Sequence, residues 1–144
     1  MSRVIIHPKV KDEYMTKLTE KTKKLKIGSG DNADTQVTPL ISQDQLQRVS
    51  NYVKSGIQSG ASLAVGGEKA HIGEGNYYQP TVFDNVKTDS TIAQEEIFGP
   101  VTSVFNFNDE EEAIDIINST KYGLASGVFT ADDQKAKWTS DRIQ

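Results

Sequence analysis

Cysteine is absent from the 144 residues of this chain. A chain without thiols forms no disulfide, no thiolate metal site and no covalent intermediate on sulfur. Histidine is nearly absent as well, because only His7 and His71 occur and neither stands at ligand spacing from another candidate. We therefore expect no metal site, and we assign no catalytic residue.

The sequence also lacks an excess of positive charge and a long apolar run. The net charge is -4, and the basic residues are scattered apart from the run at 21–26, which ends a helical pattern where cations suit the helix dipole. No stretch approaches the apolar length that spans a bilayer. These features favour a soluble, single-domain protein of the cytoplasm, with a mitochondrial parent as the alternative, and predict neither a nucleic-acid nor a membrane partner.

Apolar periodicity predicts strands that alternate with helices along the chain. The predicted strands are residues 2–7, 61–67, 80–83, 101–107 and 125–130, the first and last of them buried. The predicted helices are residues 9–25, 42–57, 109–120 and 132–144. This order indicates an α/β domain with a largely parallel sheet and flanking helices. The first strand opens the sequence and the last helix leads to no closing strand, so we expect part of a larger fold.

The helix at 42–57 has the clearest local signals. Ser42 and Gln45 form a capping-box pattern, in which each side chain bonds to the backbone of the other residue. Apolar side chains then follow on one face at steps of three and four residues, at Leu46, Val49, Val53 and Ile57. These signals together predict a helix over residues 42–57.

The stretch "AQEEIFGPV" places two carboxylates, Glu95 and Glu96, just before Phe98 and a strand. The pair could be a general acid and base, although adjacent side chains point in different directions in most backbones. It could bind a cation, although no further oxygen ligands are evident. Alternatively, one carboxylate is structural while the other accepts hydrogen bonds from ligand hydroxyls beside the aromatic ring. A solvated helix end is the fourth reading.

"QEEIFGPV" resembles the glutamate-phenylalanine signature of the NAD(P)-dependent aldehyde dehydrogenase superfamily. The similar blocks "SRVIIH", "PLIS", "GNYYQPTV" and "NSTKYGLASGVFT" occur in the same order, so the resemblance covers nearly the whole chain. It implies that Glu96 accepts hydrogen bonds from the nicotinamide ribose, that Phe98 packs near the nicotinamide, and that Leu124 lines the same region. The cofactor implied is NAD or NADP.

The same resemblance implies that residues 1–144 are the C-terminal part of an aldehyde dehydrogenase catalytic domain. They would begin just after the nucleophile cysteine and lack the dinucleotide-binding domain. Such enzymes oxidise aldehydes to acids through a thiohemiacetal on that cysteine, so we expect this chain alone to be inactive and to bind the cofactor weakly or not at all. Its partner would be the rest of a subunit. The alternative is a catalytically dead interaction module that self-associates or pairs with full-length relatives through its incomplete sheet.

Overall fold

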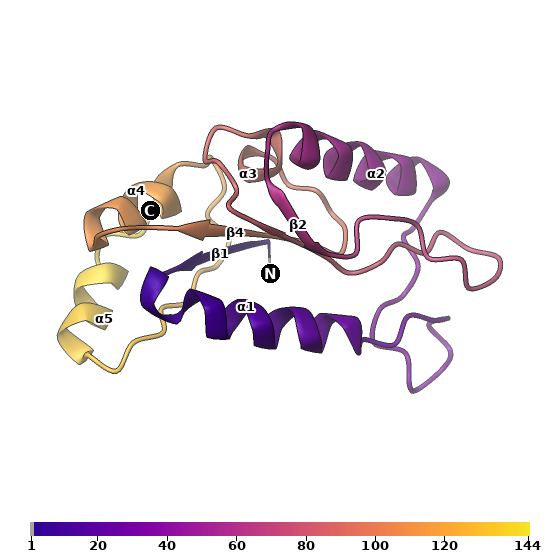
Figure 1. Ribbon diagram of the computed structural model, residues 1–144, viewed down its shortest axis with the longest axis horizontal. Helices are drawn as coiled ribbons and strands as arrows, with labels where there is room; N and C mark the ends of the chain where they lie inside the picture. Colours follow the sequence, from indigo (N-terminus) through magenta and orange to yellow (C-terminus); the bar gives the residue numbers. More distant parts are fainter. Residues whose placement is uncertain (1) are drawn as a thin grey trace.

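The computed structural model describes residues 2–144, which form one mixed sheet between helices (Figure 1). In chain order the elements are β1 (Arg3–Ile6), α1 (Pro8–Lys23), α2 (Gln43–Gln58), β2 (Ser62–Val65), β3 (Thr81–Asp84), α3 (Thr91–Gln94), β4 (Val101–Asn106), α4 (Glu110–Asn118) and α5 (Asp133–Ser140). The strand order is β1-β4-β3-β2, and only the β2–β3 pair is antiparallel. The predicted α/β class with a largely parallel sheet and flanking helices is confirmed.

Backbone sterics end β2 at the glycine pair that follows it. Gly66 has φ +75°, and a Cβ there would lie 2.3 Å from the carbonyl oxygen of Pro80. A side chain fits neither the dihedral nor the space, so only glycine allows the chain to leave the sheet at this position. The chain then returns through residues 67–80 to β3, which pairs with β2.

The sheet has a core on each face. On one face, Phe83 and Phe105 belong to the larger cluster, together with Val49 and Val53 of α2. On the other face, Ile6, Val82 and Val104 are buried, with Tyr14, Met15 and Leu18 of α1 packed against them. Figure 1 shows the corresponding arrangement, with α1 on one side of the strands and α2 and α3 on the other. The alternation of side chains along β4 supplies both cores from one strand.

The helices begin where side chains can accept from their free amides. Ser42 Oγ accepts from the Gln45 amide at 3.1 Å, and the carboxylates of Asp109 and Asp132 cap α4 and α5 in the same way. The predicted helices 9–25, 42–57, 109–120 and 132–144 thus appear as α1, α2, α4 and α5. The short α3 was not predicted, because four residues are too few to show a helical period.

Two strand predictions need correction. Residues 125–130 form no strand and lie exposed, with Phe129 98% accessible. Strand formation depends on neighbours that accept the ladder hydrogen bonds and cover the side chains, and none of the described residues supplies them here. The strand at 2–7 is β1, but only Ile6 is fully buried, because β1 lies at the edge of the sheet.

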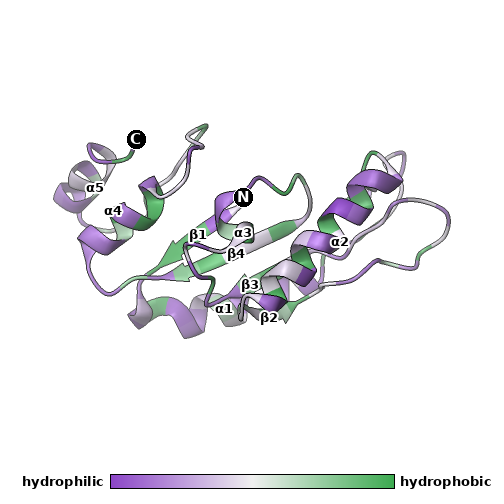
Figure 2. Cartoon of the chain, turned by 90° about the horizontal axis from the view of Figure 1, so that it is seen from above, coloured by the Kyte–Doolittle hydropathy of each residue, from purple (hydrophilic) through white to green (hydrophobic). Residues whose placement is uncertain are grey.

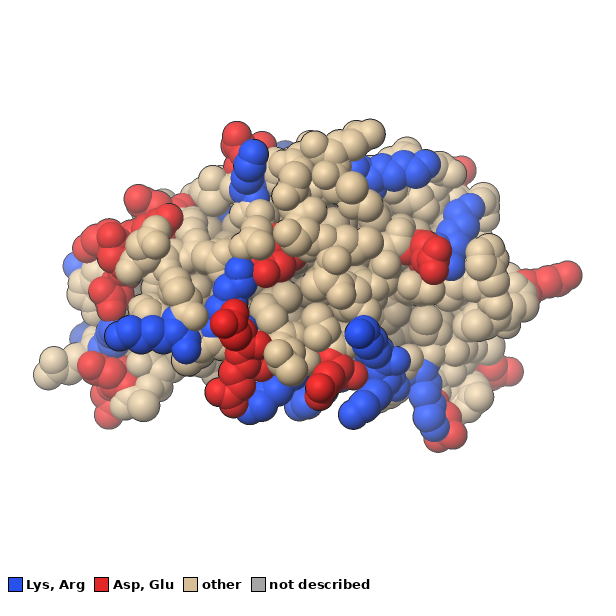
Figure 3. All heavy atoms as spheres, viewed as in Figure 1, with Lys and Arg blue, Asp and Glu red and all other residues tan. Residues whose placement is uncertain are grey.

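Polar surface surrounds this apolar sheet. Figure 2 shows strong green, hydrophobic colour along the strands and on parts of α2 and α4, whereas α1 and α5 are mainly hydrophilic. Acidic and basic side chains are interspersed on the face drawn in Figure 3. None of the helices within residues 2–144 is long and apolar enough to cross a membrane.

Candidate functional site

The segment with the two carboxylates is a turn that joins α3 to β4. It begins with Glu95, whose backbone is extended at φ -118° and ψ 150°. Three residues later Phe98 has φ +52°, in the left-handed region that non-glycine residues seldom adopt. Such a residue costs about 1–3 kcal/mol, so the surroundings must hold the turn in place.

One face of α2 provides that support. Gln45, Val49 and Tyr52 follow one another at steps of four and three residues, so they line the same side of the helix. The side-chain amide nitrogen of Gln45, Nε2, donates to the carbonyl oxygens of Ile97 at 2.9 Å and Phe98 at 3.0 Å. The capping-box prediction is therefore half confirmed, because Ser42 caps the helix whereas the Gln45 side chain binds this turn instead of returning to Ser42.

Close backbone packing adds a second point of support. Gly99 lies directly against Val49, which is fully buried. A Cβ at position 99 would be 2.5 Å from Val49 Cγ2, far inside van der Waals contact. The turn can follow α2 this closely only because residue 99 is glycine.

Glu95 is held by the same helix face. The Tyr52 hydroxyl donates to Glu95 Oε2 at 2.6 Å, and Arg48 Nη2 donates to the Tyr52 oxygen at 3.2 Å. The hydrogen bond to the Glu95 carboxylate is the main reason that the pKa of Tyr52 lies above its ordinary value, with burial as the second cause. Of the two neighbouring carboxylates, Glu95 is thus the one with a structural partner.

Glu96 differs from its neighbour. Its residue is half-buried, and no hydrogen bond or ion pair within residues 2–144 involves its carboxylate. Because Glu95 is extended, the two side chains leave the backbone on opposite sides, which disfavours a working acid-base pair. No group of three or more His, Asp or Glu side chains among the described residues could hold a metal ion, so a cation site has no ligand set there.

The predicted site residues are only partly brought together. Phe98 shares the turn with Glu96, and the residue is 70% exposed. Leu124 lies on the separate segment after α4 and is 92% exposed, so it packs against neither of them. An earlier residue of that segment, Tyr122, interacts electrostatically with Arg48. The pKa of Arg48 is raised mainly by its hydrogen bond with Tyr52, with smaller electrostatic contributions from Glu95 and Tyr122.

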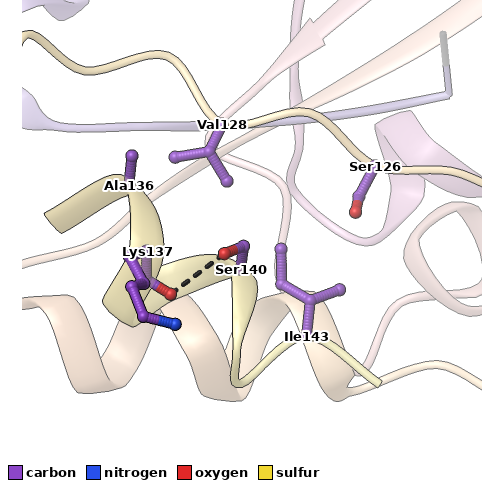
Figure 4. A pocket seen from close by; sticks show the side chains of 6 residues that line it. All are labelled: Ser126, Val128, Ala136, Lys137, Ser140 and Ile143. Atoms are coloured by element: carbon purple, nitrogen blue, oxygen red, sulfur yellow. Dashed lines mark hydrogen bonds between the residues drawn. The ribbon is translucent and has the colours of Figure 1, made fainter. Parts of the chain in front are cut away.

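A hollow of about 460 Å³ lies between α5 and the exposed segment that contains residues 125–130. Its lining residues are Ser126, Val128, Ala136, Lys137, Ser140 and Ile143 (Figure 4). The one polar link drawn there is local to α5, since Ser140 Oγ donates to the Lys137 carbonyl at 2.9 Å. Its polar lining among the described residues is limited to Ser126, Lys137 and Ser140, so the turn at 95–99 is the better candidate for binding.

Comparisons with known proteins identify the family of this chain. The model of the aldehyde dehydrogenase family matches residues 1–144, so the chain belongs to that family. It is 38% identical over 146 residues to betaine aldehyde dehydrogenase of Bacillus subtilis (strain 168), covering 99% of this chain and 30% of the relative. It is 43% identical over 129 residues to succinate-semialdehyde dehydrogenase [NADP(+)] 2 of Schizosaccharomyces pombe, covering 90% of this chain and 26% of the relative.

A solved structure shares the fold. The NAD+ complex of an aldehyde dehydrogenase from Bacillus cereus has a TM-score of 0.94 and 39% identity, and covers 99% of this chain and 29% of that one. The chain thus spans about 30% of the length of the curated relatives that it matches.

Sequence reasoning missed the contribution of α2 to the site. Gln45 and Tyr52 lie 52 and 43 residues away from the groups that they bind in the turn. The one signal in the sequence was their spacing with Val49 on a common helix face. That spacing predicts which side chains share a helix face, but it does not predict which segment the face contacts.

Proposed function

We propose that this chain supplies the nicotinamide side of the cofactor site in an NAD(P)-dependent aldehyde dehydrogenase. The proposal rests on one observation: the Glu96 carboxylate has no hydrogen-bond or ion-pair partner within residues 2–144, and it shares its turn with the exposed Phe98. Two oxygens of one carboxylate can accept from the two neighbouring hydroxyls of a ribose. The ring offers an apolar surface to the nicotinamide, and Leu124 would line the same region once its segment is covered.

The chain acts in this proposal as one part of a larger catalytic unit. Its sequence contains no cysteine that could form the covalent adduct with an aldehyde. Loss of a nucleophile can lower turnover by about 10⁶, so the chain by itself has no aldehyde dehydrogenase activity. Hydride acceptance is the chemistry that a bound NAD or NADP supplies. The role of residues 95–98 is to bind and orient the cofactor.

Both cofactors are consistent with the relatives. The Bacillus cereus structure is an NAD+ complex, whereas the Schizosaccharomyces pombe relative is named for NADP(+). The two cofactors differ on the adenosine ribose, and the proposed contacts of Glu96 and Phe98 are with the nicotinamide half. The proposal therefore covers NAD and NADP alike, with weak binding to the isolated chain.

A chimaera tests this function directly. Residues 1–144 replace the matching part of the Bacillus subtilis betaine aldehyde dehydrogenase, and cofactor-dependent oxidation of betaine aldehyde is measured. Glu96→Gln should raise the KM for NAD about tenfold, as expected for a weakened pair of charge-assisted hydrogen bonds. Glu20→Gln, an exposed change on α1, is the matched control. An unchanged KM in the Glu96 variant of an active chimaera would exclude the proposed contact.

The exposed segment favours a second candidate, an interaction module. Leu124, Val128 and Phe129 are 92%, 37% and 98% exposed, and they lie in a stretch of strand-like sequence. Such apolar surface often marks a contact with another chain. Light scattering after size exclusion distinguishes the candidates, because a module predicts an oligomer of defined mass and a monomer at tens of micromolar contradicts it.

A further inference from the structure

The hydrogen bond from Tyr52 fixes the start of the turn. The donor belongs to a buried residue, its acceptor is a carboxylate, and the oxygen–oxygen distance is 2.6 Å. Hydrogen bonds to an ionised acceptor are short and roughly twice as strong as neutral ones. This bond therefore ties Glu95 firmly to α2.

Arg48 sets the direction of that bond. Its guanidinium donates to the Tyr52 oxygen and lies over the ring, with Cζ 5.5 Å from the ring centroid. Guanidinium nitrogens can only donate, so the phenolic oxygen acts as the acceptor on this side. The phenolic hydrogen is left for the carboxylate of Glu95.

Glu96 lies between two anchors on α2. Tyr52 binds the side chain of Glu95, the residue before it. The side-chain amide of Gln45 binds the carbonyls of Ile97 and Phe98, the two residues after it. The extended backbone of Glu95 sends consecutive side chains to opposite sides. When the Glu95 side chain is fixed toward the helix, the Glu96 side chain must point away from it.

From this arrangement we propose that Tyr52 is a positioning residue, which orients Glu96 for the cofactor by holding Glu95 on α2. The inference rests on the proposed function of Glu96. Tyr52 itself touches no reacting group, and its contribution is the order that it imposes on residues 95–98. The two adjacent carboxylates accordingly have different roles, one for anchoring and one for binding.

The first experiment follows the turn in the 144-residue chain without any cofactor. Backbone ¹⁵N relaxation is measured at Glu95, Glu96 and Phe98 in the wild type and in Tyr52→Phe. The wild-type order parameters should be near about 0.85, and in Tyr52→Phe they should fall below about 0.6. Unchanged values and unchanged amide shifts in the turn would overturn the proposal.

Tyr78→Phe is the matched control. Its residue is also buried, at 3% exposure, and its hydroxyl donates to the Gly67 carbonyl at 3.0 Å, near the end of β2. Both variants remove one hydroxyl from a buried tyrosine, so a general loss of stability affects both. Only Tyr52→Phe should loosen the turn. Equal loosening in the two variants would reduce Tyr52 to an ordinary structural residue and contradict the inference.

The second experiment uses the chimaera and separates the two proposals. Tyr52→Phe should raise the KM for NAD by roughly tenfold and leave kcat within about twofold, because the lost interaction serves binding. Tyr78→Phe should leave both constants unchanged. If Glu96→Gln raises the KM and Tyr52→Phe does not, the positioning role is wrong while the proposed function stands. If Glu96→Gln itself has no effect, the proposed function fails.

Discussion

Gly99→Ala should show how closely the turn depends on α2. The added methyl group would lie 2.5 Å from Val49 Cγ2, 3.3 Å from Cγ1 and 3.5 Å from Cβ. Val49 is fully buried in the main core, so it has no free space into which to move. Overpacking of this kind costs about 1–3 kcal/mol. The clash should therefore lower the free energy of unfolding by that amount and push residues 97–99 away from the helix.

A double-mutant cycle tests the assigned cause. Val49→Ala alone should cost about 2–3 kcal/mol, from two lost methyl groups and the cavity that they leave. In the double variant, the new methyl group enters that cavity and the clash disappears. The combined loss should then fall short of the sum of the single losses by at least about 1 kcal/mol, a typical coupling for residues in contact.

Urea unfolding, followed by circular dichroism, provides the measurement. Gly127→Ala is the control, because a Cβ there meets nothing closer than Phe129 at 3.6 Å, and its effect should stay within about 0.5 kcal/mol. Strict additivity of Gly99→Ala and Val49→Ala would refute the argument, since it would show that the two side chains do not compete for the same space.

Three further predictions concern the same region. Ser42→Ala removes the hydroxyl that accepts from the backbone N–H of Gln45, and it should lower the free energy of unfolding by about 1 kcal/mol, measured by urea unfolding. Because the pKa of Tyr52 is raised in the fold, its stabilising contribution should be complete below the ordinary value of 10.0 and be lost as pH rises through the higher folded value. Absorbance titration should show one tyrosine that ionises above the ordinary pKa, and Glu95→Gln should remove most of this rise in the pKa of Tyr52. Glu96→Gln should change stability by less than about 0.5 kcal/mol in thermal unfolding, and a loss of several kcal/mol would make Glu96 structural.

Local signals in the sequence were sufficient for most of the elements. Ser42, Asp109 and Asp132 cap the helices that they were adjacent to in the sequence, because a cap acts within three residues of itself. The β-branched runs of β3 and β4 likewise became strands. The same kind of pattern at 125–130 did not, since a strand exists only where another strand accepts its hydrogen bonds.

The sequence by itself determined the family, the α/β class and the place of the two carboxylates in the stretch at 93–101. The residue pattern alone left both adjacent glutamates possible, and the family resemblance pointed to Glu96. The structure separates them through Tyr52, 43 positions from Glu95 in the chain, whose hydroxyl reaches Glu95, whereas no group within residues 2–144 bonds to the Glu96 carboxylate. Two neighbouring carboxylates are chemically alike, so only a contact made through folding, in which α2 lies along the turn, can give them different roles.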